Sequence, residues 1–194
     1  MLGNKFAQFV KGTAEVRYNY KIGHNQHLVG RMMAGAIYSY GNARISPYNE
    51  QFYIGGANSL RAFTIRSIGP GRYRPEEKNA YSYLDQTGDL KFEANLEYRF
   101  PILGDLHGAA FIDTGNIWLI RNDDQRPGGQ LKWGRFLKDL ALDAGVGLRY
   151  DLTFIVIRLD MGIPLHVPYE TDKNGYFNVP KYTPGWHLAI GYPF

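Results

Sequence analysis

Residues 90–102 read LKFEANLEYRFPI and alternate between apolar and polar side chains. Leu, Phe, Ala, Leu, Tyr, Phe and Ile fall on one face, while Lys, Glu, Asn, Glu and Arg fall on the other. A period of two indicates a β-strand with one apolar face. The stretch exceeds the ~5–6 residues usual for strands in soluble sheets, and it satisfies the ~9–11 residues that a tilted strand needs to cross a bilayer. It therefore predicts a strand that spans a membrane.

The same alternation recurs in six further segments of the chain. We expect these strands at about 5–20, 28–41, 106–118, 140–151, 154–163 and 185–194. Aromatic residues gather near the ends of the apolar faces, as they do in the interfacial girdles of transmembrane barrels. The sequence therefore predicts seven strands, each with one face suited to lipid.

The connections between these strands alternate in length. Short connections at 21–27, 103–105 and 152–153 separate long ones at 42–89, 119–139 and 164–184. Outer-membrane barrels pair short periplasmic turns with long extracellular loops. A soluble ligand-binding barrel would show the same alternation with its apolar face inward, but it has no reason to keep every long loop at one rim. The predicted fold class is all-β, an antiparallel transmembrane β-barrel.

The composition supports this class and excludes several others. The 194 residues include 23 Gly and 15 Tyr, and no apolar run approaches the ~18 residues of a spanning helix. Aromatic residues make up 15% of the chain, which is too many for a disordered protein. The absence of cysteine excludes a disulfide scaffold, a thiolate metal site and thiol catalysis. The net charge of +4 is spread along the sequence, so nucleic acid is not an expected partner.

Seven strands do not make a complete bacterial barrel. Single-chain barrels of bacteria carry an even number of strands, and an unpaired strand edge is costly in lipid. No secretory signal follows Met1. We therefore expect residues 1–194 to be the C-terminal part of a larger barrel, or a barrel that closes by association. An isolated chain is expected to self-associate through its edges at about 5–20 and 185–194.

The long connection 42–89 contains the distinctive stretch FYIGGANSLRAF at residues 52–63. Its paired glycines, Gly55 and Gly56, permit positive φ angles and a close approach to a neighbouring wall. Arg61 offers a planar fork of donors suited to a carboxylate. From composition alone, an exposed loop with a solvated arginine fits equally well.

This stretch resembles the sixth-extracellular-loop motif of the outer-membrane assembly superfamily, which contains the BamA and TamA insertases and the two-partner-secretion transporters. The matching motif residues are Gly55, Gly56, Ser59, Leu60, Arg61 and Phe63. Ala62 departs from the usual motif, which has a glycine there. Further resemblances follow in family order at 95–101, 111–118, 144–150, 157–160 and 191–194.

The resemblance implies a 16-stranded barrel of which these are the last seven strands, with periplasmic POTRA domains upstream and none in residues 1–194. It also implies that the 42–89 loop folds inward and that Arg61 meets acidic residues in the lumen. Glu97 and Asp113 occupy the matching positions, and both fall on the polar face of their strands. A solvated carboxylate in the lumen is the alternative for each.

The last segment resembles the signal that the assembly machinery reads, and in the insertases this strand forms half of a lateral seam. The residues concerned are Gly191, Pro193 and Phe194. Pro193 removes a ladder donor and Gly191 weakens strand packing, so we expect poor pairing at this edge. An ordinary barrel strand with an aromatic belt remains the alternative.

The function that these features predict is a non-enzymatic barrel that inserts or translocates outer-membrane proteins through a weak lateral seam. The alternatives are a passive porin or uptake barrel, and a membrane anchor for an upstream enzymatic domain. We expect no catalytic residues, metal or cofactor. The expected partners are outer-membrane lipid, unfolded outer-membrane protein clients, and POTRA domains or the remaining barrel strands. The expected location is the bacterial outer membrane, with a periplasmic C-terminus.

Overall fold

The computed structural model describes residues 7–42, 45–75, 84 and 86–194. The start of the first expected strand, including Met1, and parts of the 42–89 loop lie outside the described residues. Seven strands form a single antiparallel sheet in sequence order, so the predicted fold class is confirmed. The strands are β1 (Gln8–Gly23), β2 (Gln26–Tyr40), β3 (Leu90–Leu103), β4 (Leu106–Trp118), β5 (Ala141–Asp151), β6 (Val156–His166) and β7 (Gly185–Ile190).

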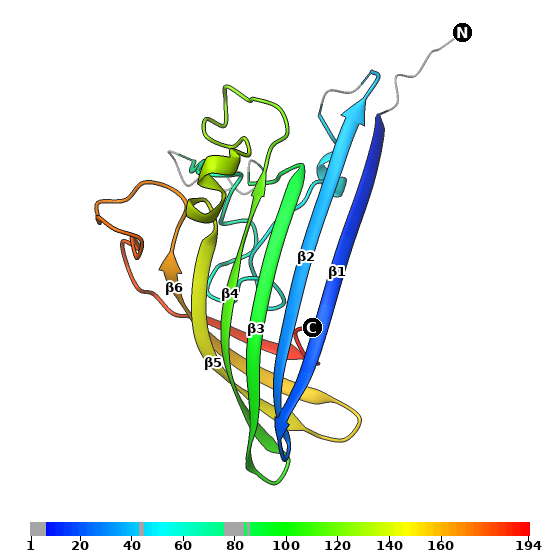
Figure 1. Ribbon diagram of the computed structural model, residues 1–194, viewed down its shortest axis with the longest axis vertical. Coiled ribbons are helices and arrows are strands. Elements are labelled where there is room, and N and C mark those ends of the chain that lie inside the picture. Colours follow the sequence, from blue (N-terminus) through cyan, green and yellow to red (C-terminus); the bar gives the residue numbers. More distant parts are fainter. Residues whose placement is uncertain (1–6, 43–44, 76–83, 85) are drawn as a thin grey trace.

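The sheet is strongly curved, and its long connections emerge at one end while its short turns lie at the other (Figure 1). Each strand pairs in continuous antiparallel register with the next one along the chain. Within the described residues, β1 and β7 each pair with one neighbour, so the sheet forms an open wall. No helix in the described part of the chain is long and apolar enough to cross a membrane.

The two faces of the sheet reverse the usual order of a soluble protein. On the convex face, apolar side chains such as Leu96, Ile112 and Val146 are about half exposed. On the concave face, Glu97 and Asp113 are fully buried. An exposed apolar belt over a buried polar interior is the arrangement that a transmembrane barrel wall requires.

The concave face is covered by the long connection between β2 and β3. Ile54, Leu60, Phe63 and Ile68 of this connection pack into one apolar cluster with residues of the wall and of the 167–184 loop. The wall and loop members of the cluster are Ile37, Ile117, Ala141, Val167 and Val179. Burying this cluster anchors the connection inside the curve of the sheet, where its polar residues can reach the inner faces of the strands.

The last strand is shorter than the alternation predicts. β7 ends at Ile190, and Gly191 adopts a φ of 82°, which interrupts the extended backbone. Residues 192–194 turn toward the concave face, where Tyr192 and Phe194 lie against the guanidinium of Arg99. The expectation that Tyr192 and Phe194 continue the outer face of this strand is therefore wrong. A local glycine conformation overrides the alternation.

Candidate functional site

The motif loop forms a tight turn that aims Arg61 at the wall. Gly55 has a φ of 101°, and a Cβ added there would lie 2.2 Å from the carbonyl oxygen of Thr64. The Gly55 N–H donates to the Ser59 hydroxyl at 3.0 Å, and the Gly56 N–H donates to the Phe63 carbonyl at 2.8 Å. These bonds close residues 55–63 into a compact turn.

Arg61 is gripped by two carboxylates on the concave face. Its Nε donates to Asp113 Oδ2 at 2.8 Å, and its Nη2 donates to Asp113 Oδ1 at 2.9 Å. Its Nη1 donates to Glu97, and its guanidinium lies 3.4 Å from the ring centroid of Phe111. Arg61 is 1% exposed. Bidentate pairing of this kind is among the strongest polar contacts in proteins.

The charge of Arg61 is secured by its partners. Burial by itself lowers the pKa of the guanidinium, because desolvation disfavours the charged form. Hydrogen bonds and charges from Asp113 and Glu97 outweigh this effect and raise the pKa above its ordinary value. The loop is therefore held by a permanent ion pair.

The structure extends this pair into a chain of buried ions that the sequence interpretation did not assign. Arg149 Nη2 lies 3.1 Å from Glu97 Oε2, and Arg149 Nη1 lies 2.6 Å from Asp160 Oδ1. Arg158 Nη1 lies 3.0 Å from Asp160 Oδ2 and also donates to the carbonyl oxygen of Ala57 at 3.0 Å. We call Arg61, Glu97, Asp113, Arg149, Arg158 and Asp160 the inner ion network.

A second set of contacts ties the loop to β2 and β3. The Asn95 amide donates to Asp113 and to the carbonyl oxygen of Ser59, both at 2.9 Å. Arg31 donates to Asn95 and to the carbonyl oxygen of Asn58, also at 2.9 Å. The Ser59 hydroxyl donates to Glu93. The motif backbone is thus bound to the sheet on both sides of Arg61.

Ala62, which stands where the motif usually has glycine, fits the turn. Its N–H donates to Asp143 Oδ2 at 3.2 Å. The wall leaves room at this point because Gly162 faces it, and a Cβ on Gly162 would lie 2.8 Å from the Ala62 nitrogen. The extra methyl group of Ala62 is therefore accommodated without displacing the loop.

The three residues expected at the seam lie beside the same site. Gly191 turns the chain, Pro193 is buried, and Phe194 approaches the inner face. The Phe194 ring centroid lies 5.2 Å from the Arg31 guanidinium, and Arg99 donates to the Phe194 carbonyl oxygen at 3.4 Å. The structure therefore brings the end of the chain and the motif loop to one inner surface.

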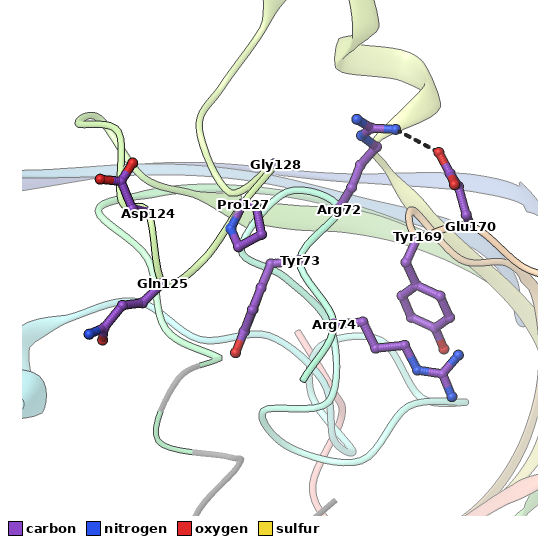
Figure 2. Close-up of a pocket in the computed structure, with 9 residues that line it drawn as sticks. All are labelled: Arg72, Tyr73, Arg74, Asp124, Gln125, Pro127, Gly128, Tyr169 and Glu170. Carbon is purple, nitrogen blue, oxygen red and sulfur yellow. Dashed lines mark hydrogen bonds and ion pairs between the residues drawn. The ribbon is translucent and has the colours of Figure 1, made fainter. Parts of the chain in front are cut away.

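A separate pocket of about 730 Å³ lies where the three long connections meet. Figure 2 shows Arg72 and Arg74 of the motif connection facing Tyr169 and Glu170. Arg72 forms an ion pair with Glu170 at 3.4 Å, and the Arg74 guanidinium lies 4.6 Å from the centre of the Tyr169 ring. These contacts join the connections above the wall and do not touch the inner ion network.

An antiparallel wall with an apolar outer face and an inner loop locked by buried ion pairs defines a transmembrane β-barrel of the outer-membrane type. The chain belongs to the Omp85 superfamily, whose domain matches residues 1–194.

Two comparisons place the chain among known members. It is 30% identical over 159 residues to the outer membrane protein assembly factor BamA of Nitratidesulfovibrio vulgaris, which covers 81% of this chain and 18% of that protein. It superposes on the crystal structure of Haemophilus ducreyi BamA lacking POTRA domains 1–3 with a TM-score of 0.58 at 16% identity. That match covers 94% of this chain and 35% of the solved chain. The chain thus spans only a minor part of the relatives that it matches.

Proposed function

We propose that this chain forms the C-terminal wall of an outer-membrane barrel that assembles other outer-membrane proteins without enzymatic chemistry. The observation that carries the proposal is the lock between Arg61 and the carboxylates of Asp113 and Glu97 within an Omp85 domain. A buried network that fixes one loop against the wall builds a rigid partition, on which a weaker edge can act separately. POTRA domains, the remaining strands and unfolded clients are the proposed partners.

The proposed working element is the edge formed by β7. This strand has 6 residues, whereas β6 has 11, and it pairs with β6 only between Ile157 and Gly162. The chain then leaves the sheet at Gly191, and Pro193 has no N–H to offer. Unpaired backbone groups at such an edge can template an incoming strand by β-augmentation. The short turns would face the periplasm, from which clients arrive.

A passive pore is the less favoured function. The motif connection packs Ile54, Leu60 and Phe63 against the wall, and the inner ion network fills the adjoining surface. Solute flow through the lumen would require this loop to leave its site. Insertion at the edge requires no such movement.

A photo-crosslinking experiment tests the proposal. A crosslinkable amino acid replaces Ala189 on β7 in the full-length protein, and a matched variant carries it at Val146 on the outer face of β5. We expect a client strand to crosslink at Ala189 and not at Val146. Equal labelling of both positions, or solute-selective conductance without client assembly in proteoliposomes, would contradict the assignment.

A further inference from the structure

The short helix η3 (Trp133–Lys138) lies on the outside of the wall. Its Phe136 ring stacks on Trp118 at 5.4 Å and meets Phe92 edge-on, also at 5.4 Å. Phe92 belongs to the outer face of β3, because its neighbour Glu93 is buried on the inner face. Figure 1 places this helix at the end of the sheet from which the long connections emerge. It therefore sits over the outer rim of the wall.

Two large apolar side chains of η3 have no cover. Trp133 is 80% exposed and Leu137 is 72% exposed, although both flank the packed Phe136. Below them, the outer face continues with exposed Ile112, Val146 and Leu148. The apolar surface of the wall thus extends upward onto η3 without interruption by an acidic side chain of the helix. Tryptophan at such a height is characteristic of the membrane–water boundary.

Cations surround these apolar side chains. Lys132 and Lys138 are exposed at the two ends of η3, and Arg135 is partly exposed between them. The nearby acidic group is Asp139, which is buried and lies 3.5 Å from Arg135. The exposed charge of the helix is therefore positive. A helix that combines a bulky apolar pair with basic residues fits the interface of an anionic bilayer.

We propose that η3 is a membrane-interface anchor that inserts Trp133 and Leu137 between lipid headgroups and binds their phosphates through Lys132, Arg135 and Lys138. The proposal rests on the proposed membrane location of the wall. Its occupant is an anionic phospholipid surface, which continues the lipid contact of the outer face. The anchor fixes the height of the β4–β5 rim in the bilayer, directly outside the strand that carries Asp113.

Spin-label accessibility tests the insertion, because the chain has no cysteine and single labels are unambiguous. Labels replace Leu137 on η3, Leu148 on the outer face of β5, and Asp172 in the exposed 167–184 loop. The whole protein is reconstituted in vesicles of phosphatidylcholine and phosphatidylglycerol, and collisions with oxygen and with a nickel chelate are compared. We expect the oxygen preference at 137 to lie between those at 148 and 172.

The outcomes separate the two proposals. If the label at 137 matches the aqueous label at 172 while the label at 148 remains in lipid, the anchor is refuted and the membrane wall stands. If the label at 148 is also aqueous, the membrane location itself fails, and the anchor fails with it.

Charge variants test the phosphate contact in the same background. Lys132→Gln with Lys138→Gln should shift the label at 137 toward the aqueous value, and vesicles of phosphatidylcholine alone should produce a similar shift. The matched control, Lys173→Gln with Lys181→Gln in the 167–184 loop, should leave it unchanged. An identical depth in all of these conditions would overturn phosphate binding by η3.

Discussion

Arg61 and Asp113 meet through two parallel hydrogen bonds of 2.8 and 2.9 Å, although 52 positions separate them in the sequence. The contact fastens the centre of a long connection to the middle of β4. Because Glu97 completes the grip from β3, the loop is fixed to two strands at once. Rotation of the loop away from the wall would leave three charged groups buried and unpaired.

Replacing Arg61 should therefore release the loop. Removing one partner of a buried ion pair typically costs ~3–5 kcal/mol, so Arg61→Ala should lower the free energy of unfolding on that scale and speed proteolysis within 45–75. Arg61→Lys should recover little, since an ammonium cannot form the two-pronged contact. Urea unfolding in detergent and limited proteolysis measure both effects.

Arg72 provides the matched control in the same connection. Its partner Glu170 has a side chain that is 92% exposed, and such surface pairs contribute only ~0–1 kcal/mol. Arg72→Ala should leave the loop protected. If Arg61→Ala behaves like Arg72→Ala, the lock contributes nothing to holding the loop.

The turn before Arg61 should be equally sensitive at Gly55. Alanine there would combine a φ of 101° with a Cβ only 2.2 Å from the Thr64 carbonyl oxygen. Strained backbone of this kind costs ~1–3 kcal/mol, and the contact adds to it. Gly134→Ala, where a Cβ would meet nothing within 4 Å, is the control. Equal unfolding midpoints for the two variants would show that the turn tolerates a side chain.

The pair formed by Arg149 and Asp160 should be energetically coupled. The two groups lie 2.6 Å apart and are fully buried. A double-mutant cycle with Arg149→Gln and Asp160→Asn should give a coupling of ~0.5–3 kcal/mol, whereas the exposed pair Lys11–Glu50 should give at most ~1 kcal/mol. Additive effects for Arg149 and Asp160 would mean that the inner ion network is not cooperative.

Two aspartates of the 119–140 connection should respond to pH with opposite signs. Burial raises the pKa of Asp139, so its contribution to stability is present below the unfolded pKa of ~3.9 and is lost as pH rises through the folded value. Asp139→Asn should therefore be more stable than the parent at pH 7, and this gain should vanish in acid.

Asp123 supplies the counterpart. The hydrogen bond from Arg126 lowers the pKa of Asp123, so its contribution is present above the unfolded pKa and is lost as pH falls. Asp123→Asn should thus be less stable at pH 7, with the difference shrinking in acid. Thermal unfolding at pH 4 and pH 7 measures both variants, and a shared sign would refute this interpretation.

The strands could be predicted because a two-residue period directly encodes a two-faced strand. The partners of Arg61 could be predicted only through the family motif, combined with the face on which Glu97 and Asp113 fall. Arg149, Arg158 and Asp160 lie on the same inner faces, which the alternation indicated. Their pairing could not be read from the sequence, since it depends on the register and curvature that bring β3, β5 and β6 around one loop.

The end of the chain shows where alternation fails as a guide. Trp186, Leu188 and Ile190 follow the outer face, but the positive φ of Gly191 turns the next residues inward. A periodic pattern carries no information about one dihedral angle. Helix η3 was missed for a related reason, because a long connection was treated as an irregular loop.

The inward turn at Gly191 can be tested by crosslinking. The Arg99 guanidinium lies 4.2 Å from the centre of the Tyr192 ring, so Arg99→Cys with Tyr192→Cys should react efficiently with a short bismaleimide. Arg99→Cys with Ile190→Cys should not, since Ile190 is on the outer face. Adding Gly191→Val should suppress the first crosslink, because a β-branched residue resists positive φ and favours a continued strand. Efficient crosslinking through Ile190, or no effect of Gly191→Val, would show that the chain continues as an ordinary strand to Phe194.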